Sequence, residues 1–211
     1  MTRPDAGAGP DGGAGREAVA DPPADADDAS GYRVRATREH FAGRVFTVVT
    51  DEVEMPGGGV ADRDYVRHVG AVGVLALDEQ GRVVLVRQYR HPLRRRLWEL
   101  PAGLVDVAGE DPAATAAREL AEEADLTAAR LDPLVDLHPS PGYSDEFIRI
   151  FVARDLSAVP PEHRHTRHQE EAELEVRRVP LPDAVRMVLT GEITNAAAVA
   201  GVLAAGYLDR A

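Results

Sequence analysis

The sequence contains no cysteine, so disulfide bonds, thiolate metal sites and cysteine nucleophiles are all excluded. Lysine is also absent, and all 24 basic residues are arginine. No apolar run is long enough to cross a bilayer, and the start of the chain lacks the basic and then apolar pattern of a signal peptide. We therefore expect a cytoplasmic protein that does not associate with membranes.

The charge balance is acidic, with a formal net charge of −12 at pH 7. Sustained binding to a nucleic-acid backbone would need a basic patch that overcomes this field, so we expect no nucleic-acid partner. Basic residues are nevertheless concentrated in residues 87–96, which contain five arginines. This stretch is either a solvated basic loop or a local anion site for a phosphorylated small molecule.

The chain has 211 residues, 44% of them hydrophobic, which is sufficient for one packed domain with appendages. Residues 1–31 are rich in Gly, Ala, Pro and Asp and poor in large apolar side chains, so we expect a disordered acidic tail. Residues 32–69 are predicted to form a small N-terminal β segment. Residues 70–211 are expected to form the main domain, which ends in helices.

The order of the predicted elements indicates the fold class. Alternating and β-branched stretches predict strands at 45–53, 62–69, 72–77, 83–86, 97–100, 131–137, 147–152 and 174–179. Propensity and periodicity predict helices at 113–124, from Pro182, and at 194–208, whereas 152–169 is expected to be mostly loop. Several strands around one central helix, with helices at the end, indicate a mixed α+β or α/β/α layered domain.

Three carboxylates on the predicted central helix are the first chemical feature. Glu119, Glu122 and Glu123 are spaced i, i+3 and i+4, so they project from one helix face. Mutual repulsion disfavours such a cluster, whereas hard divalent cations such as Mg²⁺ bind oxygen ligands of this kind. The spacing alone is equally compatible with a solvated acidic face and with a metal site.

The flanking residues favour the metal site. Gly103 precedes the helix and would allow the backbone to approach a metal or a phosphate closely. Arg118 is adjacent to Glu119 and can pair with Glu110 across the junction between loop and helix. Such a pair would hold the acidic face in place.

Residues 103–126 resemble the Nudix box. Its pattern is Gly, five residues, Glu, seven residues, Arg-Glu-aliphatic, any residue, Glu-Glu, any residue, Gly and an aliphatic residue. The matching positions in this sequence are Gly103, Glu110, Arg118, Glu119, Leu120, Glu122, Glu123 and Leu126. So many matches make the resemblance specific, and it implies a Nudix α/β/α sandwich with a mixed sheet in residues 70–211.

The sequence departs from the Nudix pattern at two places. Six residues rather than five separate Gly103 from Glu110, which is an insertion in a loop that tolerates changes of length. Asp125 occupies the position of the second Gly, directly after the helix, where a left-handed conformation is usual. Asp adopts this conformation less readily than Gly, so we expect a local loss of stability but no loss of metal ligands.

The resemblance also implies roles for individual residues. Glu119 and Glu123 would be the main Mg²⁺ ligands, with Mn²⁺ as a possible substitute, and Glu122 would be an auxiliary ligand within the catalytic set. The backbone carbonyl of Ala102 would be a further ligand. Glu110 and Arg118 would provide structural support.

Further features resemble the ADP-ribose pyrophosphatase branch of the family. These are Pro141 in the stretch 140–146, the N-terminal β segment and the stretch 189–195. In that branch a similar β segment swaps across a homodimer, so the resemblance implies a homodimer. A Glu from the loop before the last strand acts there as base or metal ligand, which favours Glu171 first and Glu170 second.

The substrate would be a small-molecule nucleotide sugar. Substrate contacts are expected from Arg87 and Arg90 with anionic oxygens, and from Glu99, Gly103, Pro141 and Ser144. Trp98 either stacks on the adenine base or is a core residue, as a lone tryptophan beside a strand is at least as often. The implied reaction is Mg²⁺-dependent hydrolysis of the pyrophosphate of ADP-ribose to AMP and ribose 5-phosphate. The alternatives are a Nudix hydrolase for dinucleoside polyphosphates or oxidised nucleoside triphosphates, and a non-catalytic ADP-ribose sensor.

His163, His165 and His168 are interpreted as solvated rather than as transition-metal ligands.

Overall fold

The computed structural model describes residues 31–107, 109–167 and 173–209. The strands are β1 (Arg33–Ala42), β2 (Phe46–Glu54), β3 (Val60–His68), β4 (Ala71–Ala76), β5 (Arg82–Arg90), β6 (Arg95–Glu99), β7 (Ala102–Leu104), β8 (Leu126–Leu137), β9 (Ile148–Ala158) and β10 (Glu175–Pro180). The α-helices are α1 (Pro112–Ala124), α2 (Leu181–Leu189) and α3 (Ala196–Leu208). Short 3-10 turns occur at η1 (His91–Leu93) and η2 (Pro161–His163).

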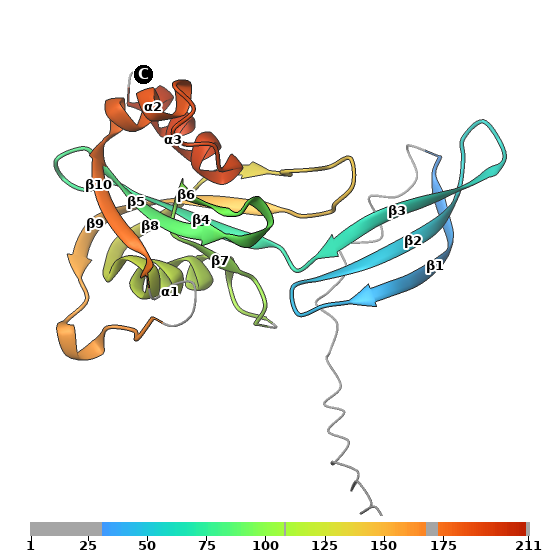
Figure 1. Cartoon of the computed structure of the whole chain (residues 1–211), viewed down its shortest axis with the longest axis horizontal. Helices are drawn as coiled ribbons and strands as arrows, with labels where there is room; N and C mark the ends of the chain where they lie inside the picture. Colours follow the sequence, from blue (N-terminus) through green and yellow to red (C-terminus); the bar gives the residue numbers. More distant parts are fainter. Residues whose placement is uncertain (1–30, 108, 168–172, 210–211) are drawn as a thin grey trace, which may run out of the picture.

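The strands form three sheets, of which two build the main domain. One has the order β10-β5-β6, and the other has the order β7-β4-β9-β8. The second sheet is mixed, because β4 runs parallel to β9 and antiparallel to β7. Helix α1 covers one side of these sheets and α2 with α3 cover the other (Figure 1). The expected α/β/α sandwich with a mixed sheet is therefore confirmed.

The strands β4 and β5 are apolar throughout because both of their faces are buried. Val74 and Val84 belong to a buried cluster with Leu120 of α1. The next residues along each strand, Leu75 and Leu85, belong to the opposite cluster beneath α2 and α3. The first cluster packs α1 against β4 and β5, and the second packs α2 and α3 against the opposite face of these strands.

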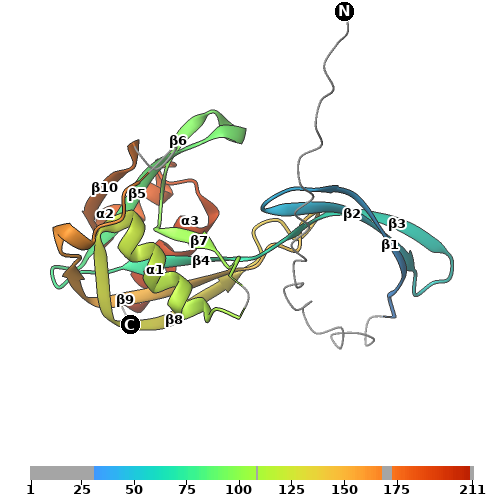
Figure 2. The same ribbon diagram turned by 90° about the horizontal axis from the view of Figure 1, so that it is seen from below.

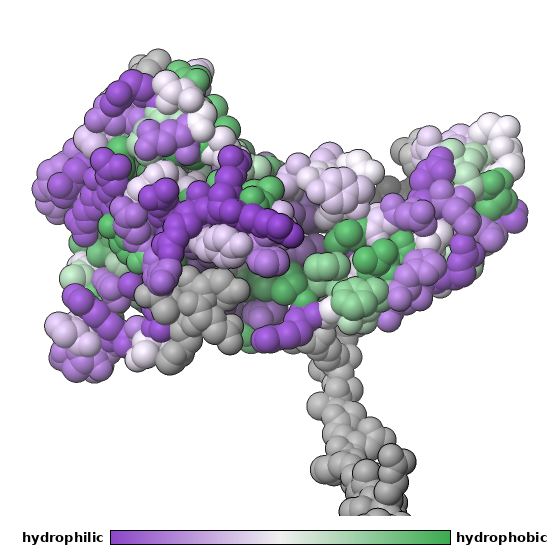
Figure 3. All heavy atoms as spheres, viewed as in Figure 1, coloured by the Kyte–Doolittle hydropathy of each residue, from purple (hydrophilic) through white to green (hydrophobic). Residues whose placement is uncertain are grey.

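The third sheet, β1-β2-β3, extends away from the main domain (Figures 1 and 2). It is joined to the loop between β8 and β9 by hydrogen bonds from the Val66 N–H to the Tyr143 carbonyl (2.8 Å) and from the Asp145 N–H to the Val66 carbonyl (3.1 Å). Exposed apolar side chains on this sheet include Phe41 and Phe46, and apolar atoms gather near its junction with the main domain (Figure 3).

Several element boundaries differ from the sequence prediction. Strand β1 lies within the predicted N-terminal β segment, but its separate position was not predicted. Strand β7 was not expected, and the prediction of a loop from 152 onward was wrong because β9 continues to Ala158. The end of β9 is paired with the start of β8, where Leu126 faces Ala158 across the ladder. Strand β1 and the end of β9 are largely exposed, so they lack the apolar alternation by which strands are predicted, and β7 has only three residues. The expected disordered tail lies outside the described residues, except for Gly31.

None of the described helices is long and apolar enough to span a membrane.

Candidate active site

Helix α1 is capped by an aspartate at each end. The side chain of Asp111 caps the N-terminus by accepting the Ala113 N–H at 2.9 Å, and Pro112 occupies the first turn. At the other end Asp125 adopts the left-handed conformation (φ 54°, ψ 37°), and its N–H bonds the Leu120 carbonyl. The conformation expected for Asp125 is therefore confirmed.

Gly103 and Glu119 are in direct contact. Gly103 lies in β7 opposite Val72 of β4, which places its Cα against α1. A Cβ atom added to Gly103 would overlap the carboxylate of Glu119. The absence of a side chain at this position therefore gives the Glu119 carboxylate its place beside the strand.

Glu123 is bound to the same strand. Its side chain is 5% exposed, and its Oε2 accepts the N–H of Ala102 at 2.9 Å. Glu119 and Glu123 are one helical turn apart, so both meet β7 from the same face of α1. At Ala102 the observed contact is through the N–H, and the expected role of its carbonyl as a metal ligand stays a prediction.

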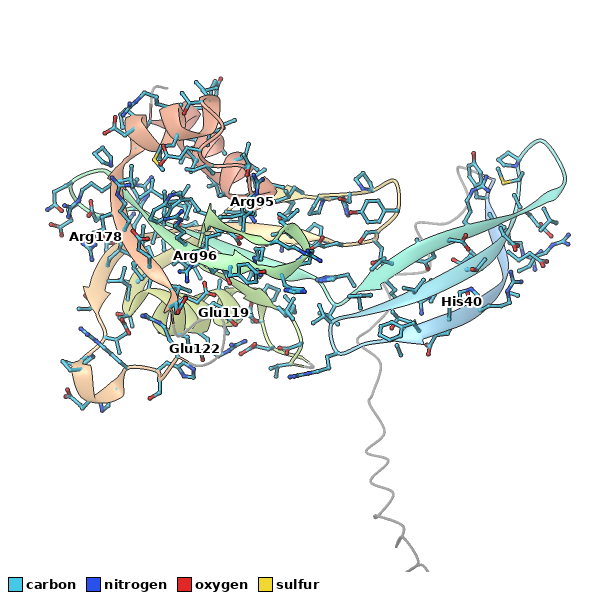
Figure 4. All side chains as sticks on the ribbon, in the orientation of Figure 1. His40, Arg95, Arg96, Glu119, Glu122 and Arg178 are labelled. Carbon is cyan, nitrogen blue, oxygen red and sulfur yellow. The ribbon has the colours of Figure 1, made fainter. Side chains whose placement is uncertain are left out.

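Arg118 links the acidic residues of the helix and the preceding loop. Its Nη1 donates to Glu119 at 2.6 Å and lies 3.7 Å from a Glu122 oxygen. Both glutamates lie on α1 and are labelled in Figure 4. Its Nη2 donates to Glu110 at 3.3 Å, which confirms the expected contact. The hydroxyl of Thr115 also donates to Glu110, at 2.7 Å. These hydrogen bonds, Thr115 first and Arg118 second, lower the pKa of Glu110 below its ordinary value.

A second ion pair lies beside this cluster. Glu99 is 2% exposed and accepts two hydrogen bonds from Arg90, at 2.9 Å from Nε and 2.7 Å from Nη2. The hydrogen bond with Glu99 raises the pKa of Arg90, burial opposes that shift, and the charges of Glu99, Glu123 and Glu146 add to it. Arg90 therefore lies among carboxylates of the protein itself, and its expected contact with anionic oxygens of the substrate stays a prediction. Sequence reasoning missed Glu146 because a single acid in a turn gives no spacing pattern.

Arg87 and Trp98 lie together on the opposite side of their sheet. They face each other in the register of β5 and β6, with the Arg87 guanidinium carbon 5.6 Å from the ring centroid. Successive strand residues point to opposite faces, so Arg90 and Glu99 project from the other side. Trp98 belongs to the buried cluster beneath α2 and α3, and Arg177 also lies over its ring at 5.8 Å.

Pro141 and Ser144 lie in the loop that supports the N-terminal sheet. Pro141 begins the turn, and Ser144 forms an isolated parallel bridge with Val66. The Ser144 hydroxyl also accepts the N–H of Glu146 at 3.0 Å. The loop that carries these two expected substrate contacts therefore also carries Glu146, whose charge acts on Arg90.

Glu170 and Glu171, the expected base and its alternative, lie outside the described residues, as does His168. The residues before them form one wall of a cleft of about 570 Å³. The cleft is lined by Arg118, Ala121, Glu122, His163, Arg164, His165 and Thr166. Both described histidines are exposed, in agreement with their interpretation as solvated side chains.

The donor chemistry of the cluster fits a hard divalent cation, because its ligands are carboxylates beside a strand glycine whose missing Cβ leaves them room. Within the described part of the chain, no group of three or more His, Cys, Asp or Glu side chains is arranged to hold a metal ion. In the described structure these carboxylates contact Arg118 and the Ala102 N–H.

Comparison with known proteins identifies the family. An ADP-ribose pyrophosphatase of Mycobacterium tuberculosis is 51% identical over 162 residues, which cover 77% of each protein. An ADP-ribose pyrophosphatase of Bacillus subtilis is 38% identical over 76% of this chain and 85% of the relative. A crystal structure of an ADP compounds hydrolase matches the fold with a TM-score of 0.70 at 23% identity, covering 85% of this chain and 94% of that structure. The NUDIX domain family matches residues 67–200, and this chain belongs to that family.

Proposed function

We propose that this protein hydrolyses the pyrophosphate bond of ADP-ribose, or of a closely related nucleoside diphosphate sugar, to AMP and ribose 5-phosphate. The observation that carries the proposal is the contact of Glu119 and Glu123 with the glycine-containing strand β7. The two ADP-ribose pyrophosphatases with 51% and 38% identity support the choice of substrate.

Mg²⁺ is the proposed metal, with Mn²⁺ as a substitute. Glu119 and Glu123 would be its main ligands, and Glu122 and the Ala102 carbonyl would assist. When bound, the metal neutralises the charge of the diphosphate and lowers the pKa of the attacking water. The oxygen donors of the cluster match the preference of this ion.

The remaining residues position these ligands and the substrate. Arg118 offsets the repulsion between Glu119 and Glu122, and Glu110 holds Arg118 from the opposite side. Arg90 is occupied by Glu99 on two of its nitrogens, which favours a positioning role over direct contact with phosphate. Glu171, or Glu170 in its place, is proposed to orient or deprotonate the water. Arg87, Trp98, Gly103, Pro141 and Ser144 stay candidates for substrate contact.

We also propose a homodimer formed through the β1-β2-β3 sheet. Every residue of β1 is exposed in the single chain, and the rings of Phe41 and Phe46 lie 6.0 Å apart on this sheet. Exposed apolar patches of this kind mark interaction surfaces. The cytoplasmic location expected from the sequence stays a prediction.

Product analysis tests the proposed function. The purified protein is incubated with ADP-ribose and Mg²⁺, and we expect AMP and ribose 5-phosphate as the products. Glu123→Gln should retain its fold but lose at least about a hundredfold in kcat, because a preorganised charge at the reacting group is removed. The matched control is Glu79→Gln, since Glu79 is exposed on the turn between β4 and β5. Turnover only of dinucleoside polyphosphates or oxidised triphosphates, or binding without turnover, would contradict the proposal.

A further inference from the structure

The residue that departs from the Nudix pattern, Asp125, has contacts that a glycine there could not make. Its backbone is left-handed, which an aspartate adopts less readily than a glycine. Its side chain accepts a hydrogen bond from Nη2 of Arg167 at 2.9 Å, and Arg164 lies at 4.0 Å on the other oxygen. The strained position is therefore occupied by a side chain that binds a distant segment.

Arg167 bridges Asp125 and the helix itself. While Nη2 binds Asp125, its Nε donates to the backbone carbonyl of Glu122 at 3.0 Å. Carbonyls at the end of a helix lack partners within the helix and favour a nearby cation. Both side chains of the pair are mostly buried, with 21% of Arg167 and 25% of Asp125 exposed, so water screens the pair only partly.

The pair joins the last turn of α1 to the segment 159–167. This turn carries Glu122 and Glu123, and the segment forms a wall of the cleft that Arg118 and Glu122 also line. The backbone supports the same junction, because the Val159 N–H donates to the Asp125 carbonyl at 2.9 Å. In the sequence, Glu170 and Glu171 follow Arg167 by three and four residues. Arg167 is the last described residue before the stretch that contains both acids.

We propose that Asp125 and Arg167 form a positioning pair that fixes the segment before Glu170 and Glu171 against the metal-ligand turn of α1. The proposal rests on the proposed function, since it assigns a role within the same site. Neither residue contacts the reacting atoms. The pair acts through the placement of the α1 turn that carries Glu122 and Glu123.

Asp125→Gly separates this role from a purely local one. Glycine adopts the left-handed conformation without strain, so a residue that only ends the helix would give unchanged kcat and unchanged or higher thermal stability. A positioning residue would instead show a loss of kcat of roughly tenfold to a hundredfold, because small displacements near the chemistry have effects of that size. KM for ADP-ribose should change much less than kcat. Asp125→Asn keeps an acceptor for Arg167 and should recover part of the loss.

The matched control is Asp155→Gly. Asp155 is also left-handed (φ 55°) and also binds an arginine, with Arg130 Nε at 2.6 Å from its Oδ2. That pair is exposed on the hairpin of β8 and β9, and we expect wild-type kcat from this variant. Arg167→Ala should lower kcat as Asp125→Gly does, and the double variant should lose little more than either single one. If the losses of kcat in the two single variants add up in the double variant, the proposed pair is overturned.

Hydrogen exchange gives a readout that does not depend on turnover. In Asp125→Gly the backbone amides of residues 159–167 should exchange faster, while those in the middle of α1 keep their protection. Unchanged exchange in 159–167, or wild-type kcat in this variant, would overturn the positioning pair. Absence of ADP-ribose hydrolysis in the wild-type protein would overturn the proposed function instead, and the exchange result would still decide whether the pair anchors the segment.

Discussion

The carboxylate of Glu119 occupies the space where a side chain on Gly103 would lie. The atoms that an added Cβ would meet first are Cγ, Cδ and Oε1 of Glu119, which form the movable end of a flexible side chain. A larger residue at position 103 would therefore displace the carboxylate rather than the backbone. The glycine acts on the chemistry through this one contact.

Gly103→Ala should consequently retain the fold and lose activity. We expect a loss of kcat of roughly tenfold or more, since a displaced charge no longer stabilises the reacting group, together with a higher Mg²⁺ requirement. The melting temperature should fall only slightly. Steady-state kinetics across a Mg²⁺ titration and thermal unfolding monitored by circular dichroism measure the two effects separately.

The control for this variant is Gly73→Ala, in the neighbouring strand β4. An added Cβ there would meet Ile150 at 3.6 Å, which is an ordinary van der Waals distance, and no carboxylate. Gly73→Ala should therefore keep both kcat and the Mg²⁺ requirement. Equal activity losses in the two alanine variants would show that the contact with Glu119 is not the cause.

The ion pair of Glu99 with Arg90 predicts a larger effect on stability. Glu99 is almost fully buried, and Glu99→Gln leaves the Arg90 guanidinium without its charged partner. Hydrogen bonds to charged groups contribute about 1.5–3 kcal/mol, so we expect the free energy of unfolding to fall by about 2 kcal/mol. Urea denaturation measures this change. The exposed pair of Arg130 and Asp155 is the comparison, and Asp155→Asn should change the free energy of unfolding much less, because water screens an exposed pair.

The position of helix α1 was predicted well from the sequence, whereas the exposed strands were predicted poorly. Glu119, Glu122 and Glu123 could be proposed as metal ligands because helical spacing and the Nudix pattern depend only on local order along the chain. The structure places Glu119 and Glu123 against β7, and their role as ligands stays a prediction. The bounds of strand β1 within the predicted β segment could not be predicted, because all its residues are exposed.

Contacts between distant segments could not be predicted from the sequence. Arg87 and Arg90 were grouped as one basic stretch, but the strand between them places their side chains on opposite faces. Glu146 and Arg167 carry no local pattern, and only the fold brings them to Arg90 and Asp125. Which face of a sheet a side chain occupies, and which loops contact each other, depend on the tertiary structure.

The contacts of Glu110 predict how stability responds to pH. The pKa of Glu110 is lowered by the hydrogen bond from Thr115 and then by Arg118, from an ordinary value of 4.5. A carboxylate whose pKa is lower in the folded state stabilises the protein above its unfolded pKa, and this contribution is lost as the pH falls through the lowered value. The difference in melting temperature between wild type and Glu110→Gln should be constant above about pH 5.5 and should shrink below 4.5.

Thermal unfolding at a series of pH values measures this difference. Thr115→Val removes the hydroxyl whose hydrogen bond contributes most to the lowered pKa of Glu110, while keeping the shape of the side chain. The loss of stability on acidification should therefore move to higher pH. A difference between wild type and Glu110→Gln that grows on acidification would contradict the assigned contacts.

The exposed rings of the N-terminal sheet provide the last prediction. Phe41 and Phe46 are 55% and 42% exposed in the single chain, and burying such rings between two copies would drive association. Phe41→Glu places a charge in this patch and should convert the proposed dimer to a monomer, as measured by sedimentation velocity at micromolar concentration. Leu189→Glu makes a similar apolar-to-acidic change at the end of α2, where Leu189 is 75% exposed, and should leave association unchanged. A dimer that survives Phe41→Glu but dissociates in Leu189→Glu would place the interface at the C-terminal helices instead.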